Sequence, residues 1–380
     1  MSKQYYTPKT GKLQGADRQE TEKIFKAVEY RLKQRNLIRR KRKVQTYRIL
    51  IRAAILYIAR RLSLRRLSEV MAEKYKVRMS AKSWQKQLLK IAEDFDAVVE
   101  EYLAERKKDD KPKKILGFPT YATDATAFSM EGKTETCLRV HTDYDLSKPG
   151  NFRAVIGDTS VGESMKIHDI EPDCLYIADR AYGTTQQMEY MFTHNGEFLF
   201  RITPGHVILY EDKDCKKRMD FQTCLSVHTE PFSKTCYFKN GKGPVYKIRV
   251  VAAPLPPDKA EKAVKKVIRS ASKKQHKVTA EAVLYAQWTV LATSLPSRIS
   301  SGRILSAYRK RWQIELHFKR AKSLLHFHRL KRASTAGTLA AAHLWVAVTT
   351  FVCLLLRTLP PFFAKHSLYD AFALSIHSIS

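Results

Sequence analysis

A single acidic residue stands among six basic ones in SAYRKRWQIELHFKRAKSLL, residues 306–325. At about 100° per residue, a helix would place four polar side chains on one stripe about 60° wide: Tyr308, Arg311, Glu315 and Lys322. A surface Glu315 could simply pair with Arg311 and Lys319 at i±4, which stabilises a helix by about 0.2–0.5 kcal/mol per pair. The same stripe could instead hold a phosphate group beside a metal ligand.

Two aspartates at the ends of predicted strands favour the second interpretation. Asp124 follows an alternating strand in YATDATAF, and Asp179 ends the apolar strand CLYIAD before the chain turns at RAYG. Either aspartate taken singly suits a turn or a cap. Together with Glu315 they supply three hard oxygen ligands of the kind that divalent cations such as Mg²⁺ require. We therefore predict that Asp124, Asp179 and Glu315 are catalytic and bind metal.

Such a set of residues suits the cleavage of phosphodiester bonds. Two metal ions about 3.5–4 Å apart activate the attacking oxygen and stabilise the leaving one, while nearby cations balance the extra negative charge. Arg311 and Lys322 are predicted to clamp phosphates beside the metals, and Tyr308 to donate a hydrogen bond to one of them. Metal and guanidinium both favour the charged form of Glu315.

The charge balance independently indicates a polyanionic partner. The 380 residues contain 69 Lys plus Arg against 37 Asp plus Glu, a net charge of +32, which favours association with nucleic acid. A ribosome-associated protein or a merely basic surface would show the same excess. The hydrophobic content of 44% suffices for a sizeable core and argues against a disordered chain.

The four residues of the stripe match the YREK signature of the insertion-sequence DDE transposases, and the surrounding stretch resembles their carboxyl-terminal catalytic block. DAT at Asp124 resembles the first-aspartate motif of that family, and ADRAYG at Asp179 resembles the second. WTVLATSLP, residues 288–296, resembles the strand before the glutamate helix. The resemblance covers about residues 115–345 and departs from the family at Ala181, where glycine is frequent.

This resemblance implies a ribonuclease H-like fold, which is an α/β mixed sheet flanked by helices and interrupted by a β-rich insertion. It implies a transposase that binds the ends of its insertion sequence, cleaves them by hydrolysis and joins the 3′-hydroxyl ends to target DNA (cut-and-paste). The implied cofactor is Mg²⁺, two ions that Mn²⁺ can replace. The implied partners are double-stranded DNA and a second copy of the chain in a homodimer on DNA. Lys319 and Arg180 are further predicted DNA contacts.

Four segments are predicted along the chain. Residues 1–114 form a helical, basic DNA-binding domain that carries 32 − 14 = +18 of the net charge. Residues 115–204 form the first part of the catalytic domain, residues 205–287 the β-rich insertion, and residues 288–380 the second part, with the glutamate helix and a closing apolar helix. Asn240-Gly241 predicts a hairpin turn inside the insertion.

The glutamate helix is predicted as one long helix that begins at about Ser301. Leu305, Trp312 and Leu316 form an apolar stripe along it. We expect this stripe to press the helix onto the sheet.

DNA recognition in the amino-terminal segment is predicted from charge and from a helix-turn-helix outline. Its densest basic run consists of Arg39, Arg40, Lys41, Arg42 and Lys43. A break at residues 76–79 precedes Ser80, which is placed to cap a second helix that carries Lys82, Trp84 and Lys86. An ordinary helical hairpin with a solvated basic face would show the same pattern.

One apolar stretch, residues 338–356, is nearly long enough to span a bilayer. Its central His343 and the break at Pro360 and Pro361 favour a helix buried in the core, so we expect no membrane association. The amino terminus lacks the apolar core of a secretory signal. Six cysteines occur without a CxxC pair, which suits a reducing compartment. We expect a bacterial or archaeal cytoplasmic protein associated with the nucleoid.

Other polar clusters are weaker candidates. His141, Asp143 and Asp145 in HTDYD have metal-like spacing, but a polar turn after a strand explains them more simply. Asp173 precedes its strand, where a loop carboxylate is ordinary. His326 and His328 could contact phosphate or be buried. Two alternative functions stay open: a catalytically silent, transposase-derived DNA-binding regulator, and a stand-alone metal-dependent nuclease that cuts without joining.

Overall fold

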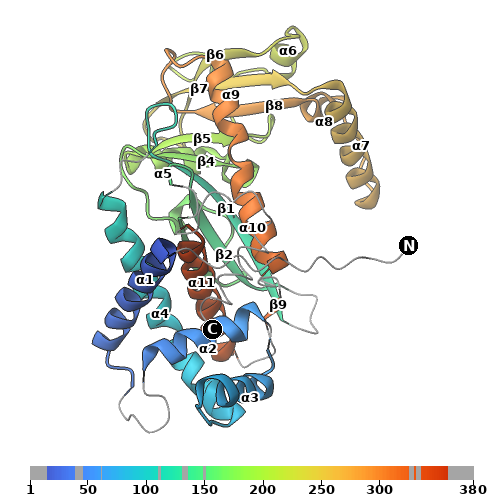
Figure 1. Cartoon of the computed structure of the whole chain (residues 1–380). Helices are drawn as coiled ribbons and strands as arrows, with labels where there is room; N and C mark the ends of the chain where they lie inside the picture. Colours follow the sequence, from blue (N-terminus) through green and yellow to red (C-terminus); the bar gives the residue numbers. More distant parts are fainter. Residues whose placement is uncertain are drawn as a thin grey trace.

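The computed structural model describes residues 15–38, 46–60, 62–109, 113–130, 136–148, 151–324, 329–330 and 335–357. A helical amino-terminal part lies at one end of a central sheet, and a pair of helices projects from the other end (Figure 1). This arrangement places the predicted catalytic strands between the two.

The amino-terminal part contains α1 (Gly15–Gln34), α2 (Tyr47–Ala59), α3 (Leu64–Tyr75) and α4 (Ala81–Asp109). The predicted break between α3 and α4 is confirmed: Lys76 ends α3 in the left-handed conformation, and the Ser80 side chain accepts a hydrogen bond from the backbone N–H of Ser83. Trp84 is fully buried. Its indole therefore packs in the core, and only its polar neighbours on α4 are open to a ligand.

Within the described residues, one mixed sheet contains nine strands in the order β3-β2-β1-β4-β5-β8-β7-β6, with β9 paired to β1. The strands are β1 (Thr120–Met130), β2 (Thr136–Asp145), β3 (Phe152–Gly157), β4 (Leu175–Ala178), β5 (Glu197–Arg201), β6 (Phe232–Phe238), β7 (Tyr246–Pro254), β8 (Trp288–Thr293) and β9 (Arg329–Leu330). Strands β1 to β3 are antiparallel neighbours, whereas β4 and β5 run parallel to β1. This topology confirms the predicted ribonuclease H-like α/β fold.

The remaining helices follow β3 in the chain. They are η1 (Met165–Ile167), η2 (Arg180–Tyr182), α5 (Thr185–Thr193), α6 (Phe221–Ser226), α7 (Pro257–Lys273), α8 (Ala280–Ala286), α9 (Ser301–Arg309), α10 (Trp312–Leu324) and α11 (Thr335–Arg357). Of these, α9 and α10 cross the sheet, while α7 and α8 stand beside it (Figure 1).

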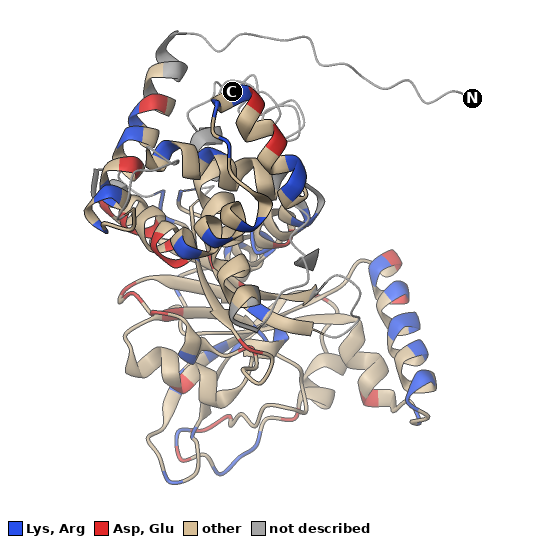
Figure 2. Cartoon of the chain, turned by 90° about the horizontal axis from the view of Figure 1, so that it is seen from below, with Lys and Arg blue, Asp and Glu red and all other residues tan. Residues whose placement is uncertain are grey.

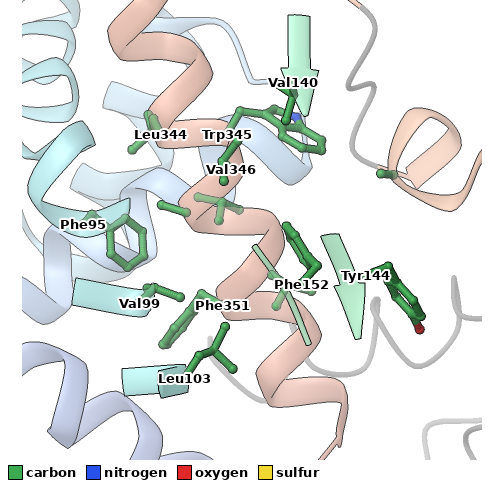
Figure 3. Close-up of a cluster of buried hydrophobic side chains, with 14 of the residues drawn as sticks. Phe95, Val99, Leu103, Val140, Tyr144, Phe152, Leu344, Trp345, Val346 and Phe351 are labelled. Carbon is green, nitrogen blue, oxygen red and sulfur yellow. The ribbon is translucent and has the colours of Figure 1, made fainter. Parts of the chain in front are cut away.

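Helix α11 joins the sheet to the amino-terminal helices. Figure 3 shows Trp345 and Phe351 of α11 between Phe95 of α4 on one side and Phe152 of β3 on the other. The ring centroids of Phe95 and Phe351 lie 5.8 Å apart, a separation at which aromatic rings attract each other. The predicted closing helix, packed on the catalytic domain, is therefore present.

His343 explains the polar residue in the middle of this apolar helix. Its Nδ1 atom lies 2.9 Å from an Asp96 carboxylate oxygen on α4. Among the described helices, none is long and apolar enough to cross a membrane.

The predicted insertion contributes strands to the same sheet. The hairpin β6–β7 turns at residues 239–245, where Gly241 has a φ of +57°, so the predicted Asn240-Gly241 turn is confirmed. β7 pairs with β8, and β8 pairs with β5. Hydrogen bonds therefore connect the insertion directly to the strands of the catalytic domain.

The prediction of one long helix from about Ser301 is wrong. The chain forms α9 and α10 with a break at Lys310 and Arg311, where N–H groups bond to carbonyls three residues earlier instead of four. The predicted apolar stripe is also wrong, because Trp312 is 56% exposed. The buried face consists of Ile304, Ala307, Ile314, Phe318 and Ala321.

Candidate active site

The pairing of β1 with β4 brings the two predicted aspartates together. Thr123 and Ala178 are partners in this parallel pair, so Asp124 and Asp179 follow as the next residues on adjacent strands. Asp124 lies within β1 and not at a strand end, which corrects the sequence-based prediction. Asp179 follows β4 directly, as predicted, and precedes η2.

Glu315 approaches Asp124 from the helix above the sheet. Ile314 and Phe318 are buried and hold α10 against the core, which places Glu315, in the first turn of α10, at the border of the buried face. The Arg311 guanidinium lies 2.5 Å from a Glu315 oxygen and 3.8 Å from an Asp124 oxygen. A single cation thus contacts acids from both elements.

Tyr308 connects the third acid to this pair. Its hydroxyl donates a hydrogen bond to an Asp179 oxygen over 3.4 Å. The Arg311 guanidinium carbon lies 5.8 Å from the centre of the Tyr308 ring, within the range of a cation–π contact. Two residues of the predicted stripe therefore join all three carboxylates through direct contacts.

Asp124 and Glu315 line a common cavity of about 590 Å³. Lys319 and Lys322 line the same cavity; Lys319 is exposed and Lys322 half-buried. Burial lowers the pKa of Lys322, and the charge of Asp124 opposes that shift. The cavity therefore presents two carboxylates and two ammonium groups to any ligand that enters.

Burial raises the pKa of the Asp124 carboxyl to about 6. A backbone N–H bond from Ala125 at 2.8 Å and the charge of Arg311 oppose this shift, whereas Glu163 and Asp179 reinforce it. For Arg311, burial lowers the pKa, but the neighbouring Tyr308, Asp179 and Glu315 outweigh burial and raise it. Arg311 is accordingly a permanent cation beside an acid that is costly to ionise.

The turn after Asp179 depends on a close approach of two backbones. A Cβ atom added at Gly183 would lie 2.1 Å from the carbonyl oxygen of Arg201, so only glycine fits there without a shift. The glycine of ADRAYG thereby lets η2 rest on the end of β5. Ala181 lies within η2 and does not prevent this turn.

Arg201 is a candidate site residue that the sequence analysis missed. With Asp179 and Arg180 it lines a second cavity of about 680 Å³. Burial and the charge of Arg201 lower the pKa of Arg180, and Asp179 opposes them. The missed signal was positional: Arg201 ends the strand parallel to β4, and parallel neighbours end at the same edge of a sheet.

The donor set suits a hard divalent cation, because it consists of carboxylate oxygens. The side chains of Asp124 and Glu315 are 22% and 34% exposed, so both are open to the cavity. Within the described ranges, however, no group of three His, Cys, Asp or Glu side chains is arranged to hold a metal ion. The convergence of the three acids on shared ions stays a prediction.

The predicted residues of the amino-terminal part lie elsewhere. Lys82 and Lys86 are exposed in the first turns of α4 and line neither cavity. The basic run from Arg39 to Lys43 lies outside the described residues, as do His326 and His328.

The interpretation of HTDYD as a polar turn is wrong. His141, Asp143 and Asp145 lie within β2 and are buried, because β1 and β3 flank this strand on both sides. Asp143 accepts a hydrogen bond from Thr123 at 2.6 Å and lies 3.0 Å from Nδ1 of His168. The Arg153 guanidinium lies 3.3 Å from the other Asp143 oxygen and supplies the charged partner that a buried acid requires.

Comparison with known proteins identifies the family. The sequence profile of the transposase DDE domain matches residues 117–351. Over 214 residues the chain is 28% identical to the InsL protein of insertion sequence element IS186A from Escherichia coli strain K12, and equally to the transposase for insertion sequence element IS421 from Escherichia coli. These matches cover 55% of this chain and 58% of each relative. The profile match, which spans more than half of the chain, shows that this protein belongs to the transposase DDE domain family.

Proposed function

We propose that this protein is a cut-and-paste transposase that binds the ends of its insertion sequence, cleaves them by metal-dependent hydrolysis and joins their 3′-hydroxyl ends to target DNA. One observation carries the proposal: Arg311 contacts both Asp124 and Glu315, while Tyr308 contacts Asp179. Three acids that are distant in sequence are thus joined by the cations and hydroxyls that phosphate chemistry requires.

Transposase DDE domains generally use divalent metal ions. We propose that Asp124, Asp179 and Glu315 hold two Mg²⁺, for which Mn²⁺ can substitute. Bound there, the ions would supply an activated water and neutralise charge on the phosphate. Arg311, a permanent cation, and Lys322 bind the non-bridging phosphate oxygens. Tyr308 holds Asp179 in orientation through its hydroxyl.

The remaining parts of the proposal concern partners and location. The amino-terminal helices hold the element end, and two copies of the chain pair the two ends as a homodimer. The net charge of +32 supports such binding to DNA. We place the protein in the cytoplasm, at the nucleoid, where its substrate lies.

A cleavage and joining assay tests the proposal. The purified chain is incubated with duplex DNA of the element's terminal repeat, a target plasmid and Mg²⁺. The parent protein is expected to give both cut and joined products. Glu315→Gln should bind the DNA equally well but lose cleavage by about 100-fold or more, since even outer-shell partners of metal ligands cost 10–100-fold.

Glu230→Gln serves as the matched control, because Glu230 is an exposed acid away from both cavities. Lys322→Ala should mainly weaken binding near the cleaved phosphate. Cleavage by the parent without joining would establish the stand-alone nuclease instead, and binding without cleavage the silent regulator. Equal cleavage by Glu315→Gln and the parent would contradict the proposed site.

A further inference from the structure

Helix α7 is a basic amphipathic helix without a buried residue. Six exposed basic side chains occupy about 120° of its circumference: Lys259, Lys262, Lys265, Lys266, Arg269 and Lys273. The acid inside this stripe is Asp258, in the first turn, where the helix dipole favours it. Within the described residues, Lys265 alone of the six has an ion pair, with Glu261. The stripe therefore offers unneutralised positive charge to solvent.

The position of α7 separates it from an ordinary solvated surface. Figure 2 shows its basic residues along a helix that stands apart from the rest of the chain. Its other side forms a wall of the 680 Å³ cavity that also contains Asp179, Arg180 and Arg201. Lys266 reaches this cavity from α7. Arg180 and Arg201 beside the candidate site and Lys266 of α7 thus line one cavity, together with the acids Asp179 and Glu281.

The position of this basic surface in the molecule indicates which part of the DNA it binds. In Figure 1, α10 lies between the amino-terminal helices and the pair α7–α8. If the amino-terminal part holds the element end and the cleaved phosphate lies at Asp124 and Glu315, a duplex that continues past the cut in the same direction leads toward α7. The 17 residues of α7 are about 25 Å long, which matches about 7 base pairs of DNA.

We propose that α7 and the cavity beside Asp179 bind the donor DNA that flanks the element, through its phosphates. This inference rests on the proposed function. It gives the insertion contacts with the donor DNA that the element leaves behind. These contacts are separate from those that hold the element end. We assign these contacts to phosphates, which fix the position of a duplex but carry no sequence information directly.

Binding measurements on two probes test the inference. Both use the full chain with Glu315→Gln, so that neither probe is cut. One probe is the element's terminal repeat followed by about 20 base pairs of flank, two turns of duplex; the other ends at the cleavage position. The test variant replaces Lys262, Lys266 and Arg269 with Gln. The control variant replaces three other basic residues with Gln. These are Lys239, Lys242 and Lys247, which are equally exposed on the β6–β7 hairpin.

The α7 variant should bind the flanked probe about 10- to 100-fold more weakly, and its slope of log K against log salt should fall by about 2 to 3, since each lost phosphate contact removes about 0.9. It should bind the shortened probe as tightly as its parent, which also shows that the variant is folded. The control variant should match the parent on both probes.

Three results would overturn the inference. An equal loss on both probes would place α7 on the element end. Unchanged binding to both probes would show that α7 binds no DNA. On an additional probe, a duplex without element sequence, a loss confined to that probe would assign α7 to target DNA. Failure of the proposed function looks different, because flank-dependent binding by α7 can persist in a chain whose parent does not cleave.

Discussion

Asp124 combines two demands that conflict at the scale of a single residue. It must be ionised to bind a metal, yet burial raises its pKa to about 6. The charge of Arg311 offsets this effect of burial only in part, since its guanidinium lies 3.8 Å from Asp124 and also contacts Glu315. The carboxylate is therefore held in place at a cost in folding stability, as is common for catalytic acids.

Replacing Asp124 with Asn should stabilise the metal-free protein. A carboxyl whose folded pKa is raised contributes stability below its unfolded pKa, near 4, and loses it as the pH rises through about 6. In the presence of a metal chelator, the free energy of unfolding of Asp124→Asn should therefore be higher than that of the parent by about 1–3 kcal/mol at pH 8. At pH 4 the two proteins should be equally stable. Chemical denaturation across this range measures the difference.

Asp214→Asn is the control for this prediction, because Asp214 is exposed and its replacement should leave the pH profile unchanged. A parent that is more stable than Asp124→Asn at pH 8 would refute the argument.

At the scale of elements, the turn η2 illustrates how a motif fixes the position of Asp179, a predicted catalytic residue. Gly183→Ala brings a Cβ within 2.1 Å of the Arg201 carbonyl, so η2 must lift from β5 and shift Asp179. We expect a loss of about 1–3 kcal/mol in unfolding free energy together with a loss of cleavage. Gly162→Ala, where an added Cβ meets no atom within 4 Å, should leave both quantities close to those of the parent.

The pair Asp96–His343 should make the junction between α4 and α11 sensitive to pH. The hydrogen bond to the Asp96 carboxylate raises the pKa of His343, and burial opposes that shift. A raised pKa means stability that is present below the unfolded value, near 6.5, and is lost as the pH rises through the folded value. As the pH rises from about 6.5 through the folded pKa of His343, the free energy of unfolding of the parent should fall. In Asp96→Asn it should fall by less. Equal slopes for the two proteins would contradict the prediction.

Sequence patterns predicted the elements whose signals are local. The strands around Asp179, the Asn240-Gly241 hairpin and the cap at Ser80 all follow from nearby residues. The break at Lys310 was not predictable, because helical periodicity continues across it. The burial of HTDYD depends on two flanking strands that are distant in sequence. For the site, the motifs identified Asp124, Asp179 and Glu315, whereas Arg201 required the order of strands.

At the scale of the whole molecule, the proposed function gives the charge a role in finding DNA. The net charge of +32 produces a field that attracts any duplex, so under this proposal specificity comes from the amino-terminal helices and the motifs of the site. The division into segments at residues 114, 204 and 287 stays a prediction. Hydrogen bonding across β5, β8 and β7 shows that the boundary near residue 205 does not interrupt the sheet.

That unbroken ladder has a mechanical consequence. α7 begins three residues after β7 ends, and β7 connects through β8 and β5 to β4, which precedes Asp179. Rows of backbone bonds hold the end of β7 at a fixed distance from Asp179, because β7 could move away from β4 only if the pairings β7–β8, β8–β5 or β5–β4 were broken. If α7 binds the flanking duplex as proposed, these three strand pairings set the spacing between the start of α7 and the candidate site.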